Sequence, residues 1–342
     1  MKFDVALAPT SLAEVPELAR RVEAIGADGL FTTETKHDPF LPLTLAAEHT
    51  ASVSLGTAVA IAFARSPMTV AHTAWDLAAQ SKGRFMLGLG TQVKPHIERR
   101  FGMQWPESPV DKLREFVAAL RAIWYAWQNN ERLNYRGQYF KLTLMTPFFD
   151  PGELEHPYIP IFLAGVNAPL VRLAGEVADG FHAHPYHTGK YLADIVLPNI
   201  EAGARRAGRS RKEIAVSAAA FVAIGETDSE RARMREAMRS QIAFYASTPT
   251  YRSVLSLHGW FAQAEALSGL AARGEWAAMP NMITDPMLAE FLVEGTWDDI
   301  GDKLRAKYSG LVDRLALYLP FTPSESDAEW KKAAHAIKTE KD

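Results

Sequence analysis

Short apolar segments alternate with segments of helical periodicity along almost the whole of this chain. The apolar segments have the length and the Val, Ile and Phe content of buried strands. We predict strands at residues 3–8, 29–34, 53–63, 84–90, 160–164, 180–183, 214–224 and 314–319. The segments between them favour helices at residues 12–25, 43–50, 67–80, 106–128, 168–176, 191–207, 228–244, 296–308 and 325–338.

This alternation is typical of parallel strands joined by crossover helices. It gives eight strand–helix pairs without a linker-like break, within the size range of one α/β barrel. We therefore predict an α/β fold, a single (β/α)8 TIM barrel that forms one domain over residues 1–342. A doubly wound sheet with a cap domain is the alternative. In a barrel, the functional groups are expected at the carboxyl ends of the strands.

Two segments interrupt the alternation. Residues of about 130–158 include a weakly alternating stretch around Arg136-Gly137, which predicts an inserted hairpin. Residues of about 245–292 are irregular and rich in aromatic side chains, just before the last strand. Long irregular segments in compact domains are often lids or pocket walls. We expect a lid-like segment there, and the alternative is a pair of helices packed outside the barrel.

The fourth predicted strand ends in Gly88-Leu89-Gly90 and runs into a polar, cationic stretch up to Gly102. Bare backbone N–H groups in such a turn can hold a phosphate. A tight turn in which the glycines only permit the bend is the alternative. The dinucleotide fingerprint is not matched, because Val93 stands where its third glycine would be. Lys94 is the most plausible charged contact for an anion, and Arg99 and Arg100 follow it.

Composition excludes several classes of function. The chain has no cysteine, which excludes disulfides, thiolate nucleophiles and cysteine-bound metals. A net charge of −3 argues against a nucleic-acid partner. No apolar run is long enough for a membrane span, and the first residues do not resemble a signal peptide. We expect a cytoplasmic protein without a membrane or nucleic-acid partner.

Polar groups gather where the predicted strands end. Glu34, His37 and Asp38 lie in one loop, and an imidazole beside carboxylates can act as a general acid or base. His182, His184 and His187 form the densest histidine cluster. It can be a polar pocket wall, a packed pair, or part of a metal site that takes a third ligand from the loop of Glu34 and His37. We expect no metal.

Over nearly its full length the sequence resembles the luciferase-like monooxygenase superfamily, in its branch of coenzyme F420-dependent oxidoreductases. The resemblance rests on the order and spacing of several motifs. These are residues 34–42 (Glu-Thr-Lys-His-Asp-Pro-Phe-Leu-Pro), 55–59 (Leu-Gly-Thr-Ala-Val) with 65–67, 83–90 (Gly-Arg-Phe-Met-Leu-Gly-Leu-Gly), 91–102, 161–165 with 178–180, and 247–251.

The resemblance implies a (β/α)8 barrel that binds a flavin or a deazaflavin at its carboxyl-end face. It implies a non-prolyl cis peptide bond behind the coenzyme ring, at Ala58-Val59. Dimers are common in the family. The resemblance also implies a region that binds the phosphate of the coenzyme. The phosphate region matches Gly90, Thr91, Gln92 and Val93, with Ala164, Gly165 and Val166 opposite.

The sequence departs from its relatives at two places. Many relatives have an acidic residue followed at once by histidine after the second strand. Here Thr35 follows Glu34, and the histidine is His37. Val93 stands near a position where some relatives use a glutamate.

We therefore predict a coenzyme F420-dependent oxidoreductase that moves a hydride between the deazaflavin and an unidentified small organic substrate. His37 is the predicted acid or base, Glu34 lies near the ring, and His184 lines the substrate side. A homodimer is expected. The alternatives are a monooxygenase that uses FMN, a metal-dependent barrel hydrolase, and a non-catalytic flavin-binding protein.

Overall fold

Eight parallel strands close into a barrel in the computed structural model, which describes residues 1–339. The barrel strands follow the ring order β1-β2-β3-β5-β8-β9-β10-β12, and β12 pairs with β1. Their bounds are β1 Lys2–Ala6, β2 Gly29–Thr32, β3 Ser54–Thr57, β5 Phe85–Gly90, β8 Ile161–Gly165, β9 Gly180–Ala183, β10 Ala215–Ile224 and β12 Arg314–Leu317. The predicted (β/α)8 barrel is confirmed.

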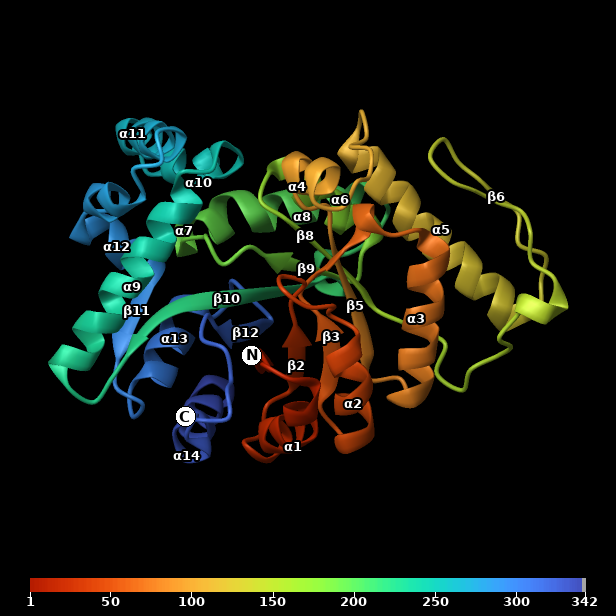
Figure 1. Ribbon diagram of the computed structural model, residues 1–342, viewed down its shortest axis with the longest axis horizontal. Helices are drawn as coiled ribbons and strands as arrows, with labels where there is room; N and C mark the ends of the chain where they lie inside the picture. The colour runs from red at the N-terminus through yellow and green to blue at the C-terminus, as the bar shows by residue number, and fades with distance from the viewer. Residues whose placement is uncertain (340–342) are drawn as a thin grey trace.

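Helices surround the barrel (Figure 1). Their bounds are α1 Val15–Ala24, α2 Leu41–His49, α3 Pro67–Gln80, α4 Lys94–Arg99, α5 Pro109–Asn129, α6 Ala168–Val177, α7 Gly189–Tyr191, α8 Leu197–Arg206, α9 Asp228–Ala246, α10 Arg252–Leu257, α11 Phe261–Ala272, α12 Asp285–Phe291, α13 Ile300–Tyr308 and α14 Asp327–Lys338. No helix within residues 1–339 has the length and apolarity to cross a membrane.

The helix predicted at residues 191–207 is interrupted. A π-helical turn at Leu192–Val196 separates α7 from α8. Pro198 explains the interruption, because it has no N–H to donate to the carbonyl group four residues earlier. The predicted helix at residues 67–80 matches α3, which has Pro67 in its first turn and the Ser66 hydroxyl as its cap.

The inserted hairpin is present, since β6 (Tyr135–Arg136) and β7 (Lys141–Leu142) pair antiparallel. Figure 1 shows this segment extending away from the barrel beside α5. The segment before the last strand contains α10 to α12 and then a strand that the sequence did not predict, β11 (Leu292–Gly295). Strand β11 pairs with the last four residues of β10, beyond the part of β10 that belongs to the barrel.

Buried side chains fill the amino-terminal half of the barrel interior. Asp4 and Arg314 form a buried, two-pronged ion pair there, with Nε–Oδ2 and Nη2–Oδ1 distances of 2.7 and 2.6 Å. Above this pair, the buried side chains of Phe31, Phe162 and His182 contact one another through their rings. We call this layer the aromatic floor, because it closes the barrel below its carboxyl-end half.

Gly88 owes its place to the close approach of β3 and β5. A Cβ atom at Gly88 would lie 1.8 Å from the carbonyl oxygen of Thr57. The Thr57 hydroxyl donates to the Gly88 carbonyl at 2.7 Å and accepts from the Gly88 N–H at 3.0 Å. At this point the side chain of Thr57 therefore takes the place of backbone hydrogen bonds between β3 and β5. We attribute the glycine at position 88 to the close packing of the two strands rather than to ligand binding.

Candidate active site

Small side chains face inward at the carboxyl-end half of the barrel. Side chains alternate along a strand, and register partners on neighbouring parallel strands share a face. Phe31 faces the interior, so its register partner Ala6 does too. Ala316 is the register partner of both Asp4 and Ala219, so the two alanines lie on the same inward face as Asp4. These inward positions are partly exposed, unlike the aromatic layer below, and include Ala6, Ala58, Ala164, Ala219 and Ala316. The barrel mouth is thus lined by small, partly exposed alanine side chains above the aromatic layer.

The peptide bond between Ala58 and Val59 is cis, as the resemblance implied. It lies between β3 and the short strand β4 (Ala60–Ile61), which pairs with the end of β5. The side chain of Val59 reaches Gly90, where an added Cβ would lie 2.7 Å from its Cγ2 atom. Ala58, Val59 and Gly90 therefore come together on one side of the mouth.

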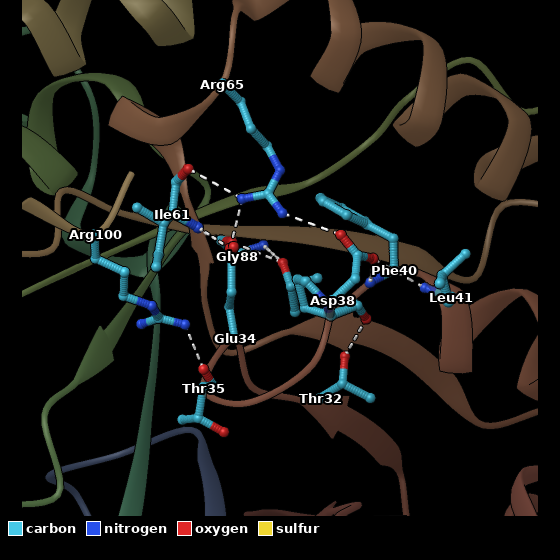
Figure 2. Close-up of polar contacts among 12 residues, drawn as sticks. Thr32, Glu34, Thr35, Asp38, Phe40, Leu41, Ile61, Arg65, Gly88 and Arg100 are labelled. Atoms are coloured by element: carbon cyan, nitrogen blue, oxygen red, sulfur yellow. Dashed lines mark hydrogen bonds and ion pairs between the residues drawn. The ribbon is translucent and has the colours of Figure 1, made fainter. Parts of the chain in front are cut away.

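The loop after β2 is held by Arg65 (Figure 2). One oxygen of the buried Glu34 carboxylate accepts from the Arg65 guanidinium at 2.5 Å and from the Ile61 N–H at 2.7 Å. Arg65 also pairs with Asp38 at 3.1 Å. The second oxygen of Asp38 accepts from the backbone N–H groups of Phe40 and Leu41, so it satisfies two N–H groups at the start of α2, whose N-cap residue is Phe40.

Glu34, placed near the ring by the sequence, is thus occupied by Arg65 and by the backbone next to β4. Sequence reasoning noted Arg65 only as part of a motif and missed this pairing. His37 lies at the exposed tip of the same loop. Its role as an acid or base stays a prediction.

The stretch after β5 is a tight turn followed by the short helix α4. Gln92 adopts a positive φ of 60°, and its side-chain oxygen accepts from the Val93 N–H. The hydroxyl of Thr91 donates to the Gln92 carbonyl. Lys94 begins α4 and is exposed, with its ammonium group 3.8 Å from Glu98. Arg100 donates to the Thr35 carbonyl at 2.5 Å and joins this turn to the loop after β2.

The exit of β8 lies next to the exit of β5, because the two strands are paired. Ala164 is the register partner of His182, and an added Cβ at Gly165 would clash with Leu170. The Val166 carbonyl accepts from the Tyr191 hydroxyl. Gly165 and Val166 line a small cavity together with His184 and His187. The two predicted halves of a phosphate region, after β5 and after β8, thus lie on neighbouring strands.

The three histidines at β9 occupy different environments. His182 belongs to the aromatic floor, where burial and the charge of Arg314 lower its pKa to about 3. Burial lowers the pKa of His184 to about 3 and the pKa of His187 to about 4. All three imidazoles are therefore neutral at neutral pH. Among residues 1–339, no three His, Asp or Glu side chains are grouped as a metal site would require.

Tyrosines complete the mouth on the side of β9 and β12. Tyr251, in the 3-10 turn Pro249–Tyr251, packs against His184 with the two rings tilted by 45°, and Tyr245 contacts both. The Tyr245 and Tyr318 hydroxyls are 2.8 Å apart. Sequence reasoning missed Tyr318, although its position two residues after the inward-facing Ala316 indicates it. The start of the lid-like segment thus packs at the mouth, while α11 packs on α9 and α10 outside the barrel.

Comparisons with known proteins agree with this architecture. The family model for luciferase-like monooxygenases matches residues 2–314. An uncharacterized protein of Mycobacterium tuberculosis is 47% identical over 315 residues, which cover 92% of each chain. The 5,10-methylenetetrahydromethanopterin reductase of Methanolobus tindarius is 28% identical over 96% of this chain and 97% of its own.

Among solved structures, the coenzyme F420-dependent tetrahydromethanopterin reductase of Methanopyrus kandleri superposes with a TM-score of 0.78. The two chains are 21% identical, and the superposition covers 98% of each. At this identity the likeness concerns the fold. The match of the family model over most of the chain decides the family. The chain belongs to the luciferase-like monooxygenase family and is an oxidoreductase of that family.

Proposed function

We propose that the barrel mouth binds coenzyme F420 and that the enzyme moves a hydride between this deazaflavin and a small organic substrate. The observation that carries the proposal is the ring of small, partly exposed alanines at the mouth, where larger side chains would take the space of a planar ring. The reductase of Methanolobus tindarius, similar over nearly the whole chain, supports a reductase chemistry. The bound coenzyme would supply or accept the hydride.

The charges around the mouth fit an anionic coenzyme tail. Lys36 and His37 are exposed on the loop after β2, and Lys94 and Arg99 are exposed on α4. The hydrogen bond from Arg100 to Thr35 joins these two loops. The chain as a whole is acidic, so this cationic rim is a local feature. We propose that Gly90, Thr91, Gln92, Val93 and Lys94 face the tail on one side and Ala164, Gly165 and Val166 on the other.

The site residues then divide by what each can do. Glu34 holds Arg65 and the backbone of Ile61, so we assign it to positioning of the loop beside the Ala58–Val59 bond. His37, on the same loop, is the candidate for proton transfer with solvent. The neutral imidazole of His184 lines the substrate side.

Titration of the purified protein with coenzyme F420, FMN and zinc, followed by fluorescence quenching, tests the proposal. We expect submicromolar binding of F420 and weaker binding of FMN. Tight binding of FMN alone would overturn the deazaflavin assignment in favour of a monooxygenase. Tight zinc binding with neither coenzyme would point to the hydrolase alternative. The homodimer stays a prediction, to be tested by sedimentation equilibrium.

A further inference from the structure

Two histidines after β9 each form a hydrogen bond with a tyrosine from a distant part of the chain. His187 Nε2 lies 3.2 Å from the hydroxyl of Tyr308, which is on the outer helix α13. His184 Nε2 lies 3.3 Å from the hydroxyl of Tyr251, which is on the lid-like segment. Both imidazoles are neutral, so each ring carries one proton on one of its two nitrogens. The hydrogen-bond partner of Nδ1 shows which of the two nitrogens carries that proton.

In the first pair, the tyrosine donates to the histidine. His187 Nδ1 lies 2.8 Å from the carbonyl oxygen of His184, and a carbonyl can only accept. The ring proton of His187 is therefore on Nδ1, which leaves Nε2 as an acceptor. The hydroxyl proton of Tyr308 is consumed in this bond. Both side chains are fully buried, so the pair ties α13 to the exit of β9.

In the second pair, the direction is reversed. The backbone N–H of Tyr186 donates to His184 Nδ1 at 3.1 Å, so Nδ1 carries no proton. The ring proton of His184 is on Nε2, and the Tyr251 oxygen accepts it. The hydroxyl proton of Tyr251 is then left for another acceptor. A hydroxyl oxygen that already accepts a hydrogen bond is also a better donor.

Tyr251 is held at the edge of the mouth. Its ring packs against those of His184 and Tyr245, which are next to Tyr318. Two more hydrogen bonds join the lid-like segment to the region after β9, one between Thr188 and His258 and one between Tyr191 and Ser253. In the second, Ser253 donates, because the hydroxyl proton of Tyr191 goes to the Val166 carbonyl. Tyr251 nevertheless remains partly exposed. Burial and the nearby Tyr245 raise its pKa to about 12, so the hydroxyl keeps its proton at neutral pH.

We propose that Tyr251, oriented by His184, donates a hydrogen bond to a carbonyl oxygen of the substrate. This inference rests on the proposed function, because it places the substrate above the coenzyme ring in the same mouth. The hydride forms the new C–H bond, the π electron pair of the carbonyl moves to the oxygen, and the donated hydrogen bond stabilises the negative charge there. The oxygen then takes the hydroxyl proton of Tyr251, and the partly exposed tyrosine regains a proton from solvent. The aromatic walls formed by Tyr245 and Tyr318 favour a flat substrate. Tyr251 is then a catalytic residue, and His184 a positioning residue.

A chromophoric carbonyl compound, 4-(dimethylamino)cinnamaldehyde, reports such a donor, because its absorption band moves to the red when its oxygen accepts a hydrogen bond. The full-length protein is titrated with this probe, with and without coenzyme F420. The variants are Tyr251→Phe, the matched control Tyr308→Phe, His184→Leu and His184→Gln. Tyr308→Phe also removes one hydrogen bond between a histidine and a tyrosine, but it is the bond to His187, in which the tyrosine is the donor. Fluorescence quenching by F420 is measured in parallel for every variant.

We expect a red shift in the wild type and in Tyr308→Phe, and its complete loss in Tyr251→Phe. His184→Leu should lose most of the shift, and His184→Gln should keep part of it, because the glutamine amide can still donate to Tyr251. Affinity for F420 should stay within threefold in Tyr251→Phe. A wild type without a shift, or a Tyr251→Phe variant that keeps it, overturns the inference. Loss of F420 binding by the wild type overturns the proposed function instead, whatever the probe shows.

Discussion

Replacing Thr57 by valine tests how β3 is joined to β5 directly below the mouth. Valine has nearly the shape of threonine, so the substitution leaves no cavity, but it removes the hydroxyl. That hydroxyl both donates to the Gly88 carbonyl and accepts from the Gly88 N–H, and all these groups are buried. In the variant, the Gly88 N–H and carbonyl lose the partner that the Thr57 side chain supplies.

The magnitude follows from those two groups. A buried polar group without a partner costs about 1–3 kcal/mol. Two such groups on one residue predict a loss of about 2–6 kcal/mol in the free energy of unfolding. With an unfolding entropy of about 2.1 cal/mol/K per residue, a chain of 342 residues should show a fall in Tm of roughly 3–8 °C.

Urea denaturation followed by tryptophan fluorescence measures this loss, with Thr57→Ser as the matched control. Serine keeps the hydroxyl and loses one methyl group, so it should cost only about 1 kcal/mol. If valine proves no more harmful than serine, the hydroxyl does not join the strands, and the argument from the two Gly88 hydrogen bonds is refuted.

Three further results are expected. Glu34→Gln should lower the free energy of unfolding by about 2 kcal/mol in urea denaturation, since it removes a charged hydrogen bond to Arg65, whereas Asp298→Asn in the exposed pair with Lys332 should change it by less than about 0.5 kcal/mol. His37→Ala should lower turnover and leave the dissociation constant of F420 within a few-fold; a variant that no longer binds F420 would make His37 a binding residue. The lowered pKa values of His182, His184 and His187 favour the neutral forms in the fold, so their contribution is complete above pH 6.5, the ordinary histidine value, and is lost as the pH falls below it. Each histidine should cost about 2 kcal/mol between about pH 6.5 and about pH 5, and a urea midpoint that stays constant over this range would contradict the burial of the three rings.

The sequence predicts the barrel well because strand length and helical periodicity are local properties. The helix at residues 67–80 and the hairpin around Arg136 follow directly from such patterns. Strand β11 escapes prediction because it exists by pairing with the overhanging end of β10. Its tertiary partner, rather than its own composition, makes it a strand.

The candidate site shows the same division. The loops that carry Glu34, Gly90 and His184 could be found, because parallel strands place their exits on one face. The partners of those residues could not be found, since Arg65 is 31 residues from Glu34 and Tyr251 is 67 residues from His184. Which partner donates the hydrogen bond in each histidine–tyrosine pair depends on a third group, and only the folded chain brings that group into contact with the histidine.

The ion pair of Asp4 with Arg314 has a consequence for the synthesis of the chain. It lies at the seam between β1 and β12, and its two residues are 310 positions apart. A chain emerging from the ribosome therefore carries an unpaired edge on β1 until β12 has been synthesised. Contacts of such large sequence separation form late and slowly. Nascent chains arrested before residue 314 should consequently be recognised by chaperones and proteases, whereas chains that include β12 and α14 should escape them.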